Sequence, residues 1–191
     1  MLTRQVVLAS ASARRLQILQ TIGIDPIVVA TRTPEKEGGA SPQDLVLANA
    51  KAKADAVSDR FIDSIIIGAD TLVVSDGKIL GKPADMDQAR QMLQTLSGKE
   101  HEVYTAICMI DTKEKKTALG FRKTKVYFSV LSDQEIDNYI ATGEPLDKAG
   151  AYGIQGAGGL FVEHIEGDYG TVVGLSLPLL KSLANKLGWN L

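Results

Sequence analysis

The sequence predicts an α/β protein in which helices pack on a mixed β-sheet. Over the first half of the chain, short apolar runs typical of strands alternate with segments of helical periodicity. Two long strand-like segments then follow one another over residues 102–131, which is typical of neighbouring strands without a helix between them. No repeat, low-complexity tract or linker interrupts the sequence, so we expect residues 1–191 to form a single domain.

The elements of the first half are predicted from apolar runs and helix-capping signals. Ser12 is a candidate N-cap of the first helix, which Gly23 ends. Ser41 is the candidate N-cap of the second helix, with Pro42 in its first turn and Asp44 three residues after the cap. The expected strands cover residues 6–9, 27–30 and 65–75, and the expected helices cover residues 13–22 and 41–57.

The second half is predicted from a hairpin turn, a capping box and a glycine-rich stretch. Asp76 and Gly77 form a two-residue hairpin signal that returns the chain through residues 78–80. Ser132 and Glu135 have the spacing of a capping box. Glycines are frequent between Gly143 and Gly159. The expected helices cover residues 85–96, 132–143 and 177–187, and the expected strands cover residues 102–111, 117–131 and 160–162.

The bulk composition is that of an ordinary globular protein, with 45% hydrophobic and 23% charged residues. A net charge of -2 gives no general reason to bind nucleic acid or an acidic membrane. The N-terminal residues lack the apolar region of a signal peptide, and no apolar run approaches the ~20 residues of a membrane span. The single cysteine, Cys108, excludes an internal disulfide and a Cys-rich zinc site. We therefore expect a cytoplasmic protein with no nucleic-acid or membrane partner.

One aspartate stands out as a candidate for chemistry. Asp70 follows the isoleucines at positions 65–67 and the small residues Gly68 and Ala69, where open α/β sheets place their ligand crevices. It could be a metal ligand or a general base, and a carboxylate that caps a turn after the strand is the alternative. Glu35 could share a divalent cation with Asp70, or be an ordinary surface acid.

Two adjacent arginines lie where a helix disfavours cations. Arg14 and Arg15 fall in the first turn of the expected helix, where the dipole costs about 0.3–1 kcal/mol for each cation. Backbone N–H groups at that end can hold an anion, which would reverse this cost. A phosphate-binding helix start and a solvated one are equally compatible with the sequence.

Several lysines could offset a polyanion. Lys51 and Lys53 are two residues apart on a helix, so at most one of them readily faces a site. Lys82 precedes a proline and is held extended, and Lys148 lies in a compact loop. Each of these lysines could equally be solvated surface.

Taken together, these residues resemble the Maf family of nucleoside triphosphate pyrophosphatases. The matching stretches follow the family's order over nearly the whole chain: LASASARR at 8–15, GADT at 68–71, GKP at 81–83, LSG at 96–98 with HEV at 101–103, and EPLDKAGAYGIQG at 144–156.

The resemblance implies an elongated fold around a bent mixed sheet, with two lobes around a cleft, similar to inosine triphosphate pyrophosphatases. It implies cleavage of a nucleoside triphosphate to the monophosphate and pyrophosphate, removing unwanted nucleotides from the pool with the help of Mg²⁺ or Mn²⁺. The DKAG and GIQG pieces resemble the subgroup that acts on dTTP and UTP. Open alternatives are action on 7-methyl-GTP and a nucleotide-binding regulator of septum formation. A homodimer also stays open.

The resemblance also assigns expected roles to individual residues. Asp70 would be the base, Glu35 would help it to hold the metal, and Lys82 would complete the catalytic set. The expected substrate-binding and specificity residues are Ser10, Arg14, Arg15, Lys51, Thr71, Lys148 and Gln155. The carboxamide of Gln155 can pair with the edge shared by thymine and uracil.

Overall fold

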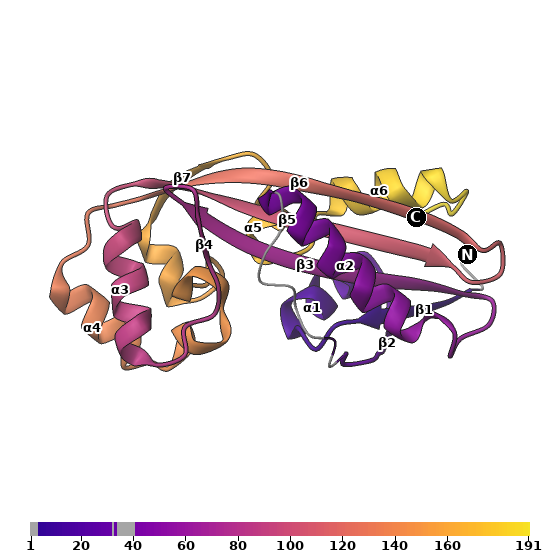
Figure 1. Cartoon of the computed structure of the whole chain (residues 1–191), viewed down its shortest axis with the longest axis horizontal. Coiled ribbons are helices and arrows are strands. Elements are labelled where there is room, and N and C mark those ends of the chain that lie inside the picture. The colour runs from indigo at the N-terminus through magenta and orange to yellow at the C-terminus, as the bar shows by residue number, and fades with distance from the viewer. Residues whose placement is uncertain (1–3, 32, 34–40) are drawn as a thin grey trace. The chain divides into compact units, whose positions relative to one another are not determined.

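The computed structural model describes residues 4–31, 33 and 41–191 of the chain (Figure 1). These residues form one seven-stranded sheet of order β2-β1-β3-β5-β6-β7, in which β4 pairs with β3 outside this path. β1 pairs in parallel with β2 and β3, whereas β3–β4 and β6–β7 are antiparallel, so the predicted mixed sheet is confirmed. The strands are β1 (Gln5–Ala9), β2 (Ile27–Val28), β3 (Ser64–Ser75), β4 (Lys78–Leu80), β5 (Glu100–Asp111), β6 (Lys116–Phe128) and β7 (Val162–Glu166).

The chain divides into two compact units, and β3, β5 and β6 contribute residues to both. The first unit holds the described residues up to Asp70, together with Thr105–Arg122 and Gly174–Leu191. The second unit holds Thr71–Tyr104 and Lys123–Val173. Each unit buries a hydrophobic core of its own.

The first unit has helices on both faces of its strands. Its helices are α1 (Ala13–Thr21), α2 (Pro42–Ser58) and α6 (Leu177–Lys186). Side chains of a strand alternate between the two faces, and Ile65, Ile67 and Ala69 of β3 join the core that includes α1 and α6. The intervening residues therefore face α2. Within the described part of the chain, no helix is both long enough and apolar enough to cross a membrane.

The two predicted N-caps of this unit have different outcomes. Ser41 caps α2 as predicted, because its hydroxyl accepts a hydrogen bond from the Asp44 N–H at 3.2 Å. Ser12 is the N-cap residue of α1, but its side chain makes no capping bond. Its backbone N–H instead donates to the hydroxyl of Ser10 at 3.2 Å. The expected side-chain cap at Ser12 is therefore wrong.

The second unit begins with the hairpin that the sequence predicts. Asp76 and Gly77 both have positive φ, at 50° and 74°, as a type I′ turn requires. The capping box of Ser132 and Glu135 is also confirmed, with both hydrogen bonds present. The helices of this unit are α3 (Met86–Leu96), α4 (Asp133–Ile140) and the short α5 (Tyr169–Val173), which the sequence analysis did not predict.

The glycine-rich stretch forms three short 3-10 helices, η1 (Glu144–Asp147), η2 (Ala149–Ala151) and η3 (Ala157–Phe161). The strand predicted at residues 160–162 is wrong, because Leu160 and Phe161 still belong to η3 and β7 begins only at Val162. The Gly159 N–H donates a hydrogen bond to the Gly156 carbonyl at 3.0 Å, so the chain forms a helical turn here before the strand begins.

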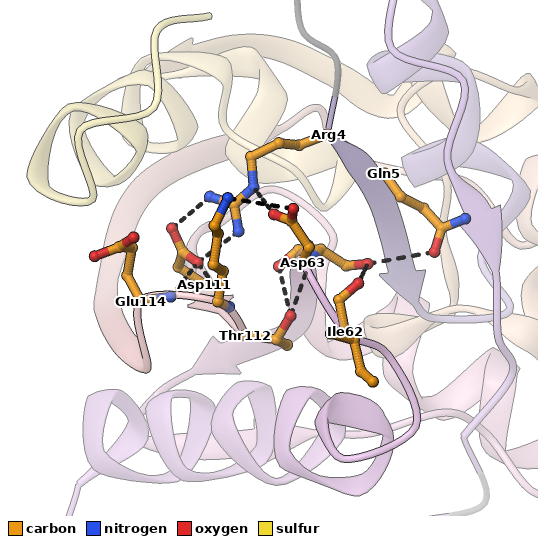
Figure 2. Close-up of polar contacts among 9 residues, drawn as sticks. Arg4, Gln5, Ile62, Asp63, Asp111, Thr112 and Glu114 are labelled. Carbon is orange, nitrogen blue, oxygen red and sulfur yellow. Dashed lines mark hydrogen bonds and ion pairs between the residues drawn. The ribbon is translucent and has the colours of Figure 1, made fainter.

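A polar network ties the first unit together where β1 begins (Figure 2). The Arg4 guanidinium donates to both carboxylate oxygens of Asp111 at 2.6 Å and pairs with Asp63 at 2.9 Å. The Thr112 hydroxyl accepts from the Ser64 N–H at 2.9 Å and donates to its carbonyl at 3.1 Å. The Arg4 hydrogen bonds lower the pKa of Asp111 to about 2. This network joins the start of β3 to the end of β5.

Candidate functional site

Asp70 lies inside β3 and not after it, because the strand continues to Ser75. Its parallel neighbour β1 ends at Ala9, which pairs with Gly68, so Asp70 lies just beyond the carboxyl end of β1. The Asp70 side chain is buried, with the residue only 3% exposed. The strand predicted over residues 65–75 is therefore confirmed and contains Asp70, and the alternative of a carboxylate that caps a turn after the strand is wrong.

Gly68 lets α2 approach β3 closely. A Cβ atom at Gly68 would lie 2.4 Å from the Ala50 carbonyl oxygen and 2.7 Å from the Ala54 nitrogen. These are backbone atoms of a helix, which cannot move aside without shifting the helix. Asn49 and Lys53 come one residue before each of these alanines and lie on the same buried face of α2. The absence of a side chain at Gly68 thus brings both polar residues to β3.

Both oxygens of the Asp70 carboxylate are held by α2. The Lys53 ammonium donates to Oδ1 at 2.6 Å, and the Asn49 carboxamide donates to Oδ2 at 3.2 Å. The side chains of Lys53 and Asp70 are 11% and 4% exposed, so this is a buried ion pair. A carboxylate oxygen has more than one lone pair, so each can accept a further hydrogen bond or bind a cation. The result is a fixed anionic group with acceptor capacity left.

Arg15 connects the start of α1 to a distant part of the same unit. Its Nε–H donates to the Gly174 carbonyl at 2.9 Å, and its Nη1 donates to the Ser10 hydroxyl at 3.0 Å. Arg15 and Ser10 are 9% and 6% exposed. Arg14, the preceding residue, is half-buried.

In the second unit, a backbone contact brings two lysine-bearing segments together. The Gly150 N–H donates to the Gly81 carbonyl at 3.0 Å, so the segment of Lys82 lies beside the loop of Lys148. Lys82 is exposed. The Lys148 ammonium donates to the Asp147 carboxylate at 2.6 Å and to the backbone carbonyl of residue 144 at 2.8 Å.

Gln155 lies on a tight turn in the same unit. The Gly156 N–H donates to the Gly153 carbonyl at 3.2 Å, which closes a four-residue turn with Gln155 at its third position. Gln155 is exposed, so its carboxamide is accessible. Thr71, which directly follows Asp70 in β3, is half-buried.

A family model described as Maf-like protein matches residues 5–187 of this sequence. The chain belongs to the Maf family. The match includes residues of both units, and it confirms the family to which the sequence motifs pointed.

Curated relatives of this Maf chain resemble it over nearly its whole length. It is 46% identical over 190 residues to a dTTP/UTP pyrophosphatase of Dictyoglomus thermophilum, covering 98% of each chain. It is 48% identical over 178 residues to a dTTP/UTP pyrophosphatase of Bacillus cytotoxicus, covering 93% of this chain and 92% of the relative. Among solved structures, that of the Staphylococcus aureus Ham1 protein matches with a TM-score of 0.46 at 14% identity, over 65% of this chain and 72% of that chain.

Lys53 is the lysine of α2 that reaches Asp70, and Lys51, which the sequence analysis selected as a substrate-binding residue, does not contact it. Lys51 pairs with Asp55 at 2.6 Å, and both side chains are about half exposed, at 50% and 48%. The two lysines are 200° apart around the helix, given 100° per residue. The sequence does contain a signal that points to Lys53. It lies on the face of α2 that is otherwise made of small and apolar residues, four residues after Asn49, which is the other polar residue of that face.

Arg15 lies in the first turn of α1 as expected, and it also makes contacts within the protein that the sequence analysis did not predict. The sequence analysis set it beside Arg14 as an anion-binding residue at the helix start. The structure turns its guanidinium to a main-chain carbonyl and to the buried Ser10 hydroxyl. Arg15 and Ser10 therefore link the segment that follows β1 to Gly174 by hydrogen bonds. Any contact of Arg15 with substrate would come in addition to these hydrogen bonds.

The Asp70 carboxylate fits a role in metal binding. A hard divalent cation such as Mg²⁺ prefers carboxylate oxygens and is commonly held by one or two of them together with substrate phosphates. Among residues 4–31, 33 and 41–191, there is no group of three or more His, Cys, Asp or Glu residues that could hold a metal ion. Glu35, the expected second ligand, lies outside the described residues. The buried Asp70 carboxylate fits a cation that is also bound by the phosphates of a substrate.

Proposed function

We propose that this Maf-family chain hydrolyses nucleoside triphosphates, with dTTP and UTP preferred, to the monophosphate and pyrophosphate. The observation that carries the proposal is the Asp70 carboxylate, buried and fixed by Lys53 and Asn49. The names of relatives that share almost half of its residues support the choice of substrate. Removal of unwanted nucleotides from the pool is the role that we propose for this reaction.

In the proposed reaction, Asp70 accepts a proton from a water molecule that attacks the α-phosphorus. The new P–O bond forms as the bond between the α-phosphorus and the bridging oxygen breaks, and pyrophosphate leaves with that oxygen. Lys53 and Asn49 orient the carboxylate, since each donates to one of its oxygens. A base that is positioned in this way contributes a typical ~10²–10⁴-fold to the rate.

We further propose that Asp70 and Glu35 hold a divalent cation, Mg²⁺ or Mn²⁺. Such a cation would offset the charge of the triphosphate and polarise its phosphoryl oxygens. Lys82, Lys148 and Arg14 are the cationic side chains proposed to bind the phosphates, because guanidinium and ammonium groups donate several hydrogen bonds to phosphate oxygens. Thr71 and Gln155 are proposed to contact the base.

The test is a pyrophosphate-release assay on purified protein with dTTP, UTP, dCTP, dGTP and 7-methyl-GTP, each with Mg²⁺ or Mn²⁺. We expect the highest kcat/KM with dTTP and UTP, loss of activity in excess chelator, and its return when the cation is added. Fastest turnover of 7-methyl-GTP would contradict the base preference but not the reaction. Nucleotide binding without any release of pyrophosphate would contradict the enzyme and favour a nucleotide-binding regulator.

A further inference from the structure

The turn that carries Gln155 is anchored at both ends by side chains from outside it. At its start, the Gly153 N–H donates to the Tyr139 hydroxyl at 3.1 Å. Just after it, the Ala157 N–H donates to Oε2 of Glu144 at 3.1 Å. All of these residues belong to the second unit.

The two anchors are themselves joined. The Tyr139 hydroxyl donates to Oε1 of Glu144 at 3.0 Å, while it accepts from Gly153. Tyr139 is only 3% exposed, and this burial raises the pKa of its hydroxyl far above the usual range. The hydroxyl therefore stays protonated and available as a donor. The Glu144 carboxylate thus accepts hydrogen bonds from Tyr139 of α4 and from Ala157, which directly follows the turn.

Glycines in the turn and just after it allow the backbone to lie directly against the Glu144 carboxylate and the Tyr139 hydroxyl. A Cβ atom at Gly156 would lie 2.2 Å from Oε1 of Glu144, and a Cβ atom at Gly153 would lie 2.9 Å from the same oxygen. A Cβ atom at Gly158 would lie 2.8 Å from the Tyr139 hydroxyl oxygen. Side chains at these positions would displace the two anchors from the turn.

Glu144 also reaches a second candidate substrate-binding residue. Its backbone carbonyl accepts a hydrogen bond from the Lys148 ammonium at 2.8 Å. The side chain of Lys148 is only 13% exposed, so this contact fixes the ammonium group at the loop. Glu144 is thus in contact both with Lys148 and with the turn that carries Gln155.

We propose that Glu144, together with Tyr139, is a specificity-positioning residue that holds the Gln155 turn in the conformation that selects the base. This inference rests on the proposed function, in which Gln155 meets the base of the substrate. A side-chain amide discriminates between hydrogen-bonding edges only when its own position is fixed, because a movable amide can rotate or shift to suit a different edge. Without the hydrogen bonds from Tyr139 and Glu144, the turn can change its conformation to suit a different base. The ratio of kcat/KM for thymine and uracil nucleotides to that for cytosine nucleotides then falls.

The test compares Glu144→Gln with wild type and with a matched control, Glu135→Gln. Glutamine has only one acceptor oxygen, so it cannot accept from both the Ala157 N–H and the Tyr139 hydroxyl, as the carboxylate does. Glu135 lies in the same unit and also accepts two hydrogen bonds, from the backbone and hydroxyl of Ser132 at 2.8 and 2.6 Å. Loss of the Glu135 carboxylate therefore weakens the N-cap of α4, the helix that carries Tyr139, without removing any contact to the turn.

The selectivity is measured in two ways. The first is the ratio of kcat/KM for dTTP and dCTP, and the second is the ratio of the dissociation constants of dTMP and dCMP by calorimetry, which needs no turnover. For Glu144→Gln we expect both ratios to fall by about tenfold, mainly through KM, since hydrogen-bonded selection is lost when its groups are misplaced. For Glu135→Gln we expect a lower melting temperature with both ratios as in wild type.

A second variant reaches the same contact without changing Glu144. Gly156→Ala places a methyl group where the carboxylate lies, so it should reproduce the lower ratios of Glu144→Gln. The inference is overturned if folded Glu144→Gln and Gly156→Ala both keep the wild-type ratios, or if Glu135→Gln lowers them equally. A wild-type protein that releases no pyrophosphate overturns the proposed function instead, while a lower dTMP preference in Glu144→Gln would still support the positioning role.

Discussion

Lys53 and Asp70 form a buried ion pair in which the Lys53 Nζ lies 2.6 Å from Oδ1 of Asp70. The pair joins α2 to the middle of β3, beside the close contact at Gly68. A charge buried in this way is tolerated only when it is paired and hydrogen-bonded. The Asn49 carboxamide completes the arrangement by donating to the other oxygen of Asp70 at 3.2 Å.

Replacing Asp70 by asparagine should abolish most of the activity. The change is nearly isosteric, but an amide cannot take the proton of the attacking water. We expect kcat for dTTP to fall by roughly 10²–10⁴-fold, the usual scale for loss of a general base. The measurement is steady-state pyrophosphate release. The control is Asp55→Asn, which removes a half-exposed carboxylate of α2 that pairs with Lys51. Near-normal turnover in folded Asp70→Asn would exclude the proposed base.

The two neighbouring lysines of α2 should respond differently to the same substitution. Lys53→Met leaves the Asp70 carboxylate buried without its ion-pair partner, a change that typically costs ~3–5 kcal/mol. Lys51→Met removes only a surface pair, worth roughly 0–1 kcal/mol. We expect a much larger loss of stability and at least tenfold lower kcat/KM for Lys53→Met, measured by denaturant unfolding and by turnover. Lys53→Arg keeps the charge and should retain the fold if Lys53→Met does not. Equal effects at both positions would contradict the assignment of Lys53.

Gly68→Ala should destabilise the first unit by overpacking. The new methyl group would meet the Ala50 carbonyl oxygen at 2.4 Å, so α2 must move away from β3. Overpacking of this kind typically costs ~1–3 kcal/mol. The control is Gly81→Ala, because nothing lies within 4 Å of a Cβ atom there. Urea unfolding of both variants measures the difference, and an unchanged midpoint for Gly68→Ala would show that α2 can shift at little cost.

His101 should make stability depend on mildly acidic pH. It is 1% exposed, its Nε2 lies 2.8 Å from the Tyr152 hydroxyl, and burial lowers its pKa to about 4. As the pH falls from about 6.5 to about 4, the unfolded chain binds a proton that the folded chain does not. The free energy of unfolding should therefore fall with falling pH, by up to roughly 3 kcal/mol.

The variant that tests this dependence is His101→Gln, with the exposed His164→Gln as control. Urea unfolding at pH 7 and at pH 4.5 gives the difference for each protein. We expect His101→Gln to lose a large part of the pH dependence and His164→Gln to keep it. If wild type and His101→Gln lost equal stability at pH 4.5, other groups would be responsible.

The sequence predicts most elements of the fold because their signals are local. Capping residues and apolar periodicity locate α2, α3, α4 and α6, and the Asp76-Gly77 pair locates the β3–β4 turn. The strand predicted at residues 160–162 fails because Leu160 is apolar yet 86% exposed, and apolarity alone does not distinguish such a residue from a strand residue.

The candidate site is less predictable, because its contacts join residues far apart in the chain. The choice between Lys51 and Lys53 depends on which face of α2 meets β3, and that is decided by the contact at Gly68. The bond of Arg15 to Gly174 spans 159 residues, so no local pattern indicates it. Asp70 could be proposed as a candidate from the sequence, because its carboxylate lies in an apolar run, but its partners Lys53 and Asn49 could not.

The boundary between the two units falls between Asp70 and Thr71, consecutive residues of one strand. On the proposed function, the proton acceptor and its partners Lys53 and Asn49 belong to the first unit. Thr71 and Gln155, which are proposed to contact the base, belong to the second unit, as do Lys82 and Lys148, which are proposed to bind the phosphates. The residues that select the base can then vary in one half of the chain while the proton acceptor and its two partners in the other half stay the same. Exchange of residues 123–173 between enzymes of different preference is the corresponding route for engineering.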